Sequence, residues 1–356
     1  KADMIVPLVV IYLFGLPGIH SLVDHCAESV ICFNPGFAQD ITKCDVVSGW
    51  DIKVNENWKL SANKDHFYNT RAGVMYLDII PKEEGNVQGM KRQNPSVKVL
   101  KTVHLKGQRH ESKVDIISGQ FPWLMNHKLF DGVVLVVDQL IPESLDRDIR
   151  IFRKLYENDV QVKHIFVKLS IADSLQRDLM EKCQEIGHIS GIILDAESRE
   201  LKNLVDKKAT LSMINFKASS FSLRKIIDTW TEYNSTRLYP YIEVNPLMCE
   251  HDDENKGSYF CSLISFNEMC EAKLYEDPSW FSWRRSKPKQ SLIKPENIYK
   301  LKVEENIYYY ESIASLTLRM KTLANAFGAL SFSLWGVYDW NQSCENFSNL
   351  IKSAKC

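Results

Sequence analysis

Short apolar runs alternate with amphipathic stretches over most of the chain. Several of the runs are apolar at every residue, as expected when both faces of a strand are covered. They predict strands over residues 30–33, 45–52, 73–79, 97–105, 132–137, 164–169, 191–194, 211–216 and 329–334. The stretches between them carry hydrophobic residues at helical spacing, as over 145–157, 174–186, 223–231 and 312–326. This alternation predicts βα units and a parallel sheet.

Roughly eight strands with intervening helices favour an α/β fold of the (β/α)8 TIM barrel type. A doubly wound open sheet has the same local pattern, and periodicity alone does not separate the two. The alternation breaks over residues 238–310, which hold three cysteines, an acidic run and aromatic clusters. We interpret this segment as an α+β subdomain inserted between the last two strands. The barrel then comprises residues 22–237 and, with its last strand and a C-terminal helix, residues 311–356.

The first residues have the character of a secretory signal. An apolar segment runs from Met4 to Ile19 and is followed by His20 and Ser21. It is too short for a comfortable membrane span and contains prolines and glycines, which fits a signal peptide cleaved near Ser21. A buried first strand is the alternative. With residues 1–21 as a signal peptide, the mature chain is expected to be secreted, extracellular and without a membrane span.

Secretion changes the interpretation of the nine cysteines. No pair has the spacing of a zinc site, so we predict several disulfides, no metal and no cofactor. The odd number leaves at least one cysteine unpaired or paired between chains, and Cys183 is the candidate for a free thiol. Glycosylation sequons agree with export and lie at Asn234, Asn341 and Asn346. The net charge of −1 gives no indication of a nucleic-acid partner.

The most informative segment is the apolar strand from Phe130 to Asp138. It opens with a Phe-Asp-Gly turn, continues through apolar residues and ends on a single carboxylate. Side chains two residues apart on a strand point the same way, so Val134, Val136 and Asp138 form one line toward its carboxyl end. Asp131 is expected to serve the turn itself, since Asp-Gly suits a turn.

Further segments accompany this strand in a recognisable order. They are Cys32-Phe33-Asn34-Pro35, the run from Cys44 to Ile52, Asn94-Pro95-Ser96-Val97-Lys98-Val99-Leu100, the run from Ser265 to Glu271, and the run from Gly328 to Leu334. Together they give most of the chain a resemblance to the chitinase-like proteins of glycoside hydrolase family 18. In that family the strand equivalent to residues 130–138 reads roughly FDGxDxDxE. The resemblance implies a barrel with an α+β insertion.

The resemblance also implies a disulfide pattern. The expected pairs are Cys32–Cys44 and Cys270–Cys344. The first pair closes a shorter loop than is usual in the family, so Cys26 competes as a partner. A Cys249–Cys261 pair and a pairing of Cys356 are conjectures.

Departures from the family pattern imply loss of hydrolysis. In the family, the N-acetyl group of the substrate attacks the anomeric carbon, a glutamate protonates the leaving oxygen, and a neighbouring aspartate orients the acetamide. Here Val134 and Val136 replace the two middle acids, and the shorter Asp138 replaces the glutamate. The Met-x-Tyr-Asp strand of the family corresponds to residues 192–195, which contain no tyrosine. Losing one electrostatic contact of this kind costs about 3–4 kcal/mol of barrier, so we expect a pseudo-enzyme.

Three functions follow as hypotheses. The first is a secreted growth or immune modulator that binds a protein partner or receptor. The second is a lectin for chitin-type glycans, with Trp50, Trp123, Phe332 and Trp335 as candidate sugar contacts. Phe332 would then replace the tryptophan that lies under the sugar in the family. The third is a weakly active chitinase that uses Asp138.

A basic and aromatic run lies within the expected insertion. Between Trp280 and Lys289, aromatic residues are interleaved with the cations of Arg284, Arg285, Lys287 and Lys289. Such a run could bind a sulfated glycan or an acidic partner through charge and stacking. A solvated basic loop is the alternative.

Overall fold

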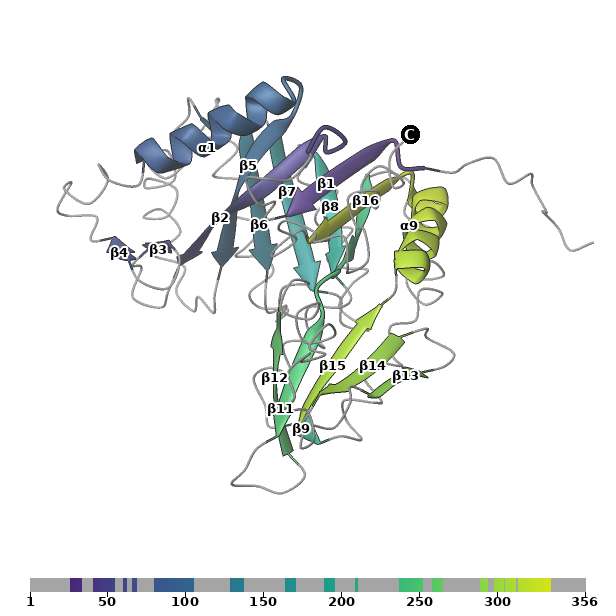
Figure 1. Ribbon diagram of the computed structural model, residues 1–356. Helices are drawn as coiled ribbons and strands as arrows, with labels where there is room; N and C mark the ends of the chain where they lie inside the picture. Colours follow the sequence, from purple (N-terminus) through teal and green to yellow (C-terminus); the bar gives the residue numbers. More distant parts are fainter. Residues whose placement is uncertain are drawn as a thin grey trace, which may run out of the picture.

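The computed structural model describes residues 26–33, 41–54, 60–62, 66–68, 80–105, 129–137, 164–170, 189–195, 209–210, 237–251, 258–264, 289–293, 298–303, 305–311 and 313–333. These residues form a parallel barrel and a separate antiparallel sheet (Figure 1). The strands expected at 73–79 and 211–216 and the helices expected at 145–157, 174–186 and 223–231 lie outside the described residues. None of the helices within them is long and apolar enough to cross a membrane.

Eight parallel strands close into a barrel. In order around the ring they are β1 (Ser29–Phe33), β2 (Val46–Val54), β5 (Lys98–Leu105), β6 (Gly132–Val137), β7 (His164–Ser170), β8 (Gly191–Asp195), β10 (Leu238–Ile242) and β16 (Ala329–Ser333). The first strand pairs with β2 on one side and with β16 on the other. This closure confirms the TIM barrel and excludes the open sheet, because an open sheet would leave β1 unpaired on one side.

The seventh barrel strand, β10, corrects a predicted boundary. It lies within residues 238–310, which the sequence analysis assigned to the insertion. Its sequence contains Pro240, and proline argues against a central strand because it donates no ladder hydrogen bond. The structure accommodates this proline where the strand changes neighbours, since residues 238–240 pair with β8 while Tyr241 and Ile242 pair with β16. The insertion therefore begins after residue 242.

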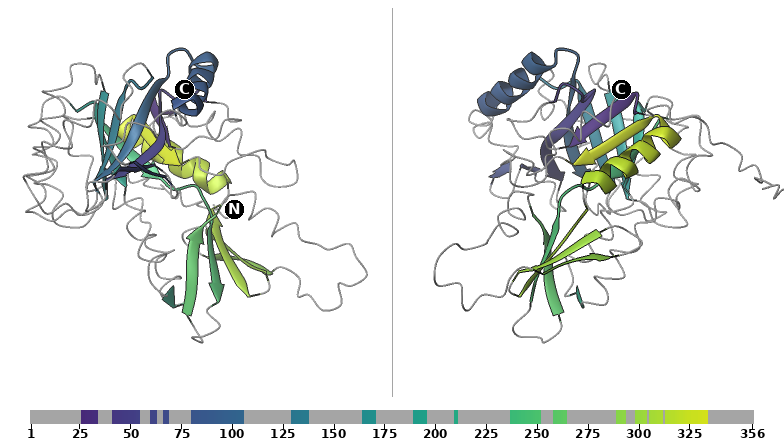
Figure 2. Two further views of the ribbon diagram at one scale, coloured as in Figure 1. Left: turned by 90° about the vertical axis from the view of Figure 1, so that its left-hand side faces the viewer. Right: turned by 45° about the vertical axis from the view of Figure 1, so that its right-hand side comes forward.

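Within the described residues, two helices pack outside the barrel. Helix α1 (Ile80–Gln93) precedes β5, and α9 (Ile313–Phe327) packs against β10 and β16 (Figure 2). The second of these confirms the helix expected at 312–326. It ends at Gly328, whose φ of 66° is a conformation that favours glycine. Two short antiparallel strands, β3 (Leu60–Ala62) and β4 (His66–Tyr68), extend the sheet beyond β2.

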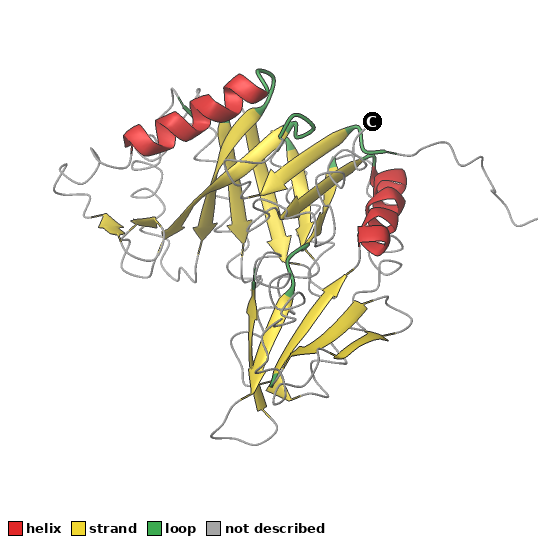
Figure 3. Ribbon diagram, in the orientation of Figure 1, coloured by secondary structure: helices red, strands yellow, loops and turns green. Residues whose placement is uncertain are grey.

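The insertion contains a second sheet. Its antiparallel strands, in spatial order, are β13 (Lys289–Ile293), β14 (Ile298–Val303), β15 (Asn306–Glu311), β11 (Leu247–His251), β12 (Ser258–Leu263) and β9 (Ala209–Thr210). The last of these comes from the chain segment expected to belong to the barrel. A disulfide joins Cys249 to Cys261, which are directly opposite each other on β11 and β12. Figure 3 shows this sheet on the side toward which β5, β6 and β7 point, so it lies near the carboxyl end of the barrel.

Side chains brace the amino-terminal end of the barrel. Asp45 Oδ2 accepts a hydrogen bond from the backbone N–H of Val30 at 2.8 Å. In the same way, Asp131 Oδ2 accepts one from the N–H of Val99 at 2.9 Å. Each aspartate precedes a barrel strand and holds the start of the strand before it. Asp131 also forms a 3.0 Å ion pair with Lys91 of α1, which agrees with the structural role expected for it.

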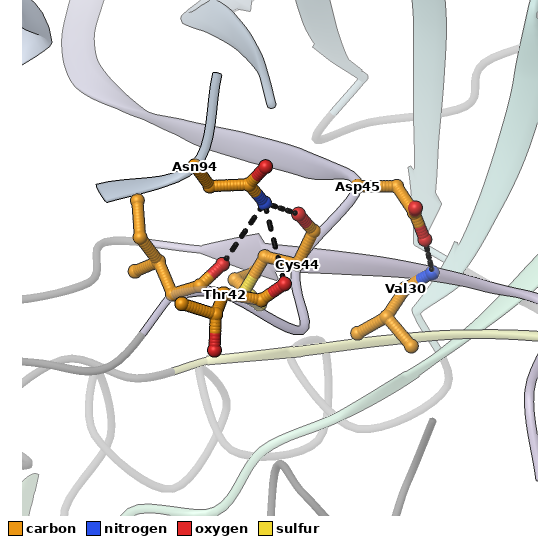
Figure 4. Close-up of a disulfide and its surroundings, with 7 residues drawn as sticks. Val30, Thr42, Cys44, Asp45 and Asn94 are labelled. Carbon is orange, nitrogen blue, oxygen red and sulfur yellow. Dashed lines mark hydrogen bonds between the residues drawn. A yellow bond between two sulfur atoms is a disulfide. The ribbon is translucent and has the colours of Figure 1, made fainter. Parts of the chain in front are cut away.

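Asn94 and a disulfide fix the loop before β2. Cys32 and Cys44 are joined, as the resemblance implied. Cys26 is also disulfide-bonded, so it does not compete for Cys44. The amide nitrogen of Asn94 donates to the carbonyl oxygen of Cys44 at 2.9 Å and, more weakly, to that of Thr42 at 3.4 Å (Figure 4). One buried side chain therefore supplies the hydrogen bonds that this loop lacks.

The glycine of the Phe-Asp-Gly turn is required by a close approach of two strands. A Cβ atom at Gly132 would collide with the backbone carbonyl of His164 on β7. Backbone held in a barrel ladder cannot move aside as a flexible side chain can. The survival of Phe-Asp-Gly in this chain therefore has a structural explanation that needs no catalytic role.

We predict that Gly132→Ala lowers the free energy of unfolding by about 3 kcal/mol or prevents folding, because the added methyl group forces β6 and β7 apart. Gly85→Ala is the matched control, since α1 leaves open space at that position. Alanine is the better helix former, so the control should gain about 0.5–1 kcal/mol. Urea unfolding followed by circular dichroism measures both changes, and equal stability of the two variants would contradict the prediction.

Candidate functional site at the carboxyl end of the barrel

The barrel interior is filled by one cluster of buried side chains to which every barrel strand contributes. Because strand residues alternate between faces, its members are those that point inward. They are Ile31, Phe33, Val46, Leu100, Val134, Val136, Phe166, Ile193, Tyr239, Tyr241 and Ala329. Aromatic rings within it meet edge to face, with 5.5 Å between the centroids of Phe33 and Tyr241 and 5.7 Å between those of Phe166 and Tyr239.

The two valines of β6 belong to this interior. Val134 is 0% exposed and Val136 is 8% exposed. The sequence predicted that Val134, Val136 and Asp138 point the same way, and the two valines point into the barrel. Asp138 itself lies outside the described residues, so its position is not part of the site as described here. At these two levels the barrel presents methyl groups and no carboxylate from β6.

A lysine crosses the interior near its carboxyl end. Lys168 lies on β7, directly opposite Val136 in the register of β6 and β7. Its Nζ is 2.8 Å from Asp195 Oδ2 on β8, and the two side chains are 13% and 2% exposed. The same Nζ lies 3.4 Å from the ring centroid of Tyr241 and 5.1 Å from that of Phe33. Strands β7 and β1 are on opposite sides of the eight-stranded ring, so the side chain of Lys168 reaches across the lumen.

A second polar group follows on β10 and the segment after it. Tyr241 Oη donates to Glu243 Oε2 at 3.0 Å. Glu243 Oε1 accepts from the backbone N–H of Asn245 at 3.1 Å and from its side-chain amide at 2.7 Å. That amide also donates to Ser333 Oγ on β16 at 3.3 Å. The hydrogen bonds thus join the last two barrel strands just where the insertion leaves the barrel.

Burial changes the acidity of two groups in this network. It raises the pKa of the Glu243 carboxyl, because desolvation disfavours the charged form more than the hydrogen bonds of Asn245 and the charge of Lys168 favour it. Burial also raises the pKa of Tyr241 well above its ordinary value, and the neighbouring carboxylates of Glu243 and Asp195 add to this effect. Tyr241 is therefore a hydrogen-bond donor throughout the ordinary pH range.

Of the four candidate sugar contacts, only Phe332 has a described side chain. Phe332 is 0% exposed, and its neighbours on β16, Ser331 and Ser333, make the contacts with β10 and Asn245. Since Ala329 points inward, alternation turns Phe332 away from the lumen and leaves the short Ser333 at the inward position. The expectation that Phe332 takes the place of a sugar-contacting tryptophan is therefore corrected. Trp50 lies where an extra residue interrupts the register of β2 with β5, between Gly49 and Ile52.

Most other predicted site residues lie outside the described residues. These are the side chain of Trp50, the tryptophans Trp123 and Trp335, the cations of Arg284, Arg285 and Lys287, the pair Cys270–Cys344, the sequons at Asn234, Asn341 and Asn346, and the signal segment 1–21. Of Lys289, only the backbone, at the start of β13, is described.

The sequence analysis missed Lys168, Tyr241 and Glu243. Lys168 is the one charged residue inside the apolar run of β7, and a lone charge in a buried parallel strand is a signal of an internal partner. Tyr241 and Glu243 alternate on a strand that the proline had obscured. Asp195 was named only as the end of a strand without tyrosine, and its partner was not foreseen.

No family model matches the chain, and no curated protein matches its sequence significantly. Solved structures that resemble this chain include chitinases. A Group IV chitinase from Ostrinia furnacalis has a TM-score of 0.60 at 12% identity, covering 92% of this chain and 98% of that one. For a class V chitinase from Nicotiana tobaccum the values are 0.58 and 11%, with 92% and 97% covered. For a chitinase from Chromobacterium violaceum they are 0.56 and 9%, with 92% and 99% covered.

This likeness concerns the fold alone at such low identity. The chain has the barrel fold of these chitinases, as its sequence resemblance predicted. Activity and ligands do not follow from the fold, because they depend on the side chains at the site.

We predict that Lys168→Met destabilises the protein by about 3–5 kcal/mol, because Asp195 then keeps a buried negative charge without its ammonium partner. The double variant Lys168→Met with Asp195→Asn removes both charges and should recover most of this loss. Arg237→Met is the matched control, since its ion pair with Glu28 is exposed and worth less than about 1 kcal/mol. Urea midpoints report all three, and a Lys168→Met variant as stable as Arg237→Met would refute the buried pair.

Glu243 gives a pH dependence with a definite sign. Its pKa is raised in the folded protein above the ordinary value of 4.5, so the folded state binds this proton more tightly than the unfolded state. The contribution of Glu243 to stability is therefore fully present below pH 4.5 and is lost as the pH rises through the folded pKa. Relative to Glu243→Gln, the wild type should lose free energy of unfolding over that rise. Parallel urea titrations from pH 4 to 8 measure the stability of both proteins. A wild type that gains stability relative to Glu243→Gln as the pH rises would contradict the prediction.

Proposed function

We propose that this chain is a secreted, non-hydrolytic chitinase-like protein that acts by binding a protein partner or receptor. The observation that carries the proposal is the occupation of the barrel interior near its carboxyl end by Lys168, its partner Asp195 and two buried valines. In TIM barrels this end is where reactions take place.

Hydrolysis with the help of an N-acetyl group requires an acid that protonates the leaving oxygen and a carboxylate that stabilises the acetamide as it attacks. Val134 and Val136 supply neither hydrogen bonds nor charge. Asp195 is engaged by an ammonium group at 2.8 Å, so its charge is already balanced before any substrate arrives. A missing electrostatic contact costs about 3–4 kcal/mol of barrier, and two of them lower the rate by several orders of magnitude.

Lys168 would also counteract a substitution that restores a carboxylate at position 136. Because Lys168 is the register partner of Val136, a carboxylate introduced there would lie beside an ammonium. The new charge would form an ion pair instead of facing a substrate. The loss of the acids and the gain of the lysine are thus complementary, which supports a barrel whose interior serves stability.

The buried position of Phe332, the one candidate sugar contact with a described side chain, favours a protein partner over a glycan. A lectin of this fold needs an aromatic face at the inward end of the last strand, because sugar rings stack on such faces. Here the inward residue is Ser333, and the aromatic ring of Phe332 is fully buried on the other side of the strand. Export of the chain rests on the signal-like segment 1–21 and the sequons.

We expect the purified protein to release fluorophore from a methylumbelliferyl chitobioside at the rate of buffer, with an active chitinase as positive control. Asp138→Ala should leave this background unchanged, and Val134→Asp with Val136→Asp and Asp138→Glu should not raise it while Lys168 remains. Calorimetry with chitohexaose should show no binding heat. Turnover that Asp138→Ala abolishes would refute the absence of hydrolysis, and micromolar binding of chitohexaose would replace the protein partner with a glycan.

A further inference from the structure

Among the described strands, the outer strand of the insertion sheet has a neighbour on one side only. Within the described part of that sheet, β13 pairs on one side only, with β14 (Figure 1). Its described side chains are exposed, with Leu292 at 40% and Ser291 also on the surface. An edge strand offers a row of backbone N–H and C=O groups to another extended chain. The opposite edge, β9, is only two residues long and is a poorer template.

The two faces next to this edge differ in chemistry. Lys300 and Lys302 are two residues apart on β14 and share one face, on which Ser291 lies directly opposite Lys300. On the other face Leu292 lies opposite Tyr299, and the ring of Tyr299 stacks on that of Tyr310 with centroids 5.4 Å apart. One face of the edge is thus cationic, and the other is apolar and aromatic.

The lysines have no carboxylate opposite them in the ladder. Lys300 pairs with Ser291 and Tyr309, and Lys302 pairs with Ile307 and with Lys289, another cation. The charge of Lys302 also contributes to lowering the pKa of Lys300, after the larger effect of desolvation. In the sequence, Arg284, Arg285 and Lys287 come just before β13. Among the described side chains, Lys300 and Lys302 therefore make this face of the edge cationic.

We propose that β13 is the docking edge for an extended strand of a partner protein whose residues alternate between acidic and apolar. Paired with β13, such a strand directs its carboxylates to the face of Lys300 and Lys302 and its apolar side chains to Leu292 and Tyr299. Adjacent strands are about 4.8 Å apart. The short Ser291 leaves room for Lys300 to turn from the ring of Tyr309, whose centroid is 5.8 Å from its Nζ, toward the docked strand. The proposal rests on the proposed function, since it assigns the surface through which a protein partner is bound.

The same charges select against a second copy of this chain. Two β13 edges placed side by side would bring cations together, and like charges opposite one another destabilise a strand pair. Lysines on edge strands are a known protection against self-association. An acidic strand removes this repulsion, so the feature that prevents pairing with another copy favours pairing with the partner.

A labelled peptide with the sequence Thr-Glu-Val-Glu-Val-Glu-Val-Thr, blocked at both ends, tests the docking edge by fluorescence polarisation with the full chain. We expect saturable binding that weakens by about tenfold or more in Lys302→Glu and also in Leu292→Ser. Lys98→Glu, an exposed lysine on barrel strand β5, is the matched control and should bind as the wild type does. A peptide with lysine in place of glutamate should not bind.

Absence of binding by the acidic peptide, or equal binding by Lys302→Glu and the wild type, would overturn the docking edge. Binding of a sulfated oligosaccharide in place of the peptide would likewise overturn it and indicate a polyanion site. These results are independent of the chitobioside assay. If the peptide fails while hydrolysis is absent, the proposed function stands and the partner binds elsewhere.

Discussion

The ion pair between Lys168 and Asp195 is the interaction on which the interior of this barrel depends. Burying a lysine costs several kcal/mol unless a charge and further contacts compensate it. Here Asp195 supplies the charge at 2.8 Å, and the rings of Tyr241 and Phe33 lie beneath the ammonium. Once the lysine is held in this way, its side chain reaches from β7 toward β1, and the valines of neighbouring β6 form an apolar wall beside it. The interior is then a packed core with one compensated charge.

The two ends of the barrel have separate physical tasks. At the amino-terminal end, Asp45, Asp131 and Asn94 satisfy backbone groups of neighbouring strands and loops. Such side chains are needed by the fold whatever the function. At the carboxyl end, the inward side chains decide chemistry, and there β6 supplies Val134 and Val136 while β7 supplies Lys168. A chitinase-like fold does not by itself fix the chemistry at this end, because different residues are responsible for each.

The sequence carried the fold more clearly than the site. Predominantly apolar runs marked seven of the eight barrel strands, because a strand covered on both faces admits few polar residues. The strand that contains Pro240 was not predicted, since its proline is tolerated only where the strand changes neighbours, and no local sequence pattern reveals that change. The valines at positions 134 and 136 were visible directly in the sequence. The pairing of Lys168 with Asp195 was not, because it depends on the register between strands. Phe332 was misplaced for a related reason, since one residue of shift on a strand reverses the face.

The central claim is that the barrel interior is closed to a sugar at the level of Val136. The most direct measurement is an experimental structure of the protein soaked with chitobiose at high concentration. The predicted result is an unchanged interior, with the ammonium of Lys168 between Asp195 and Tyr241 and no sugar in the lumen. A sugar ring beside Val136, with Lys168 displaced from Asp195, would contradict it.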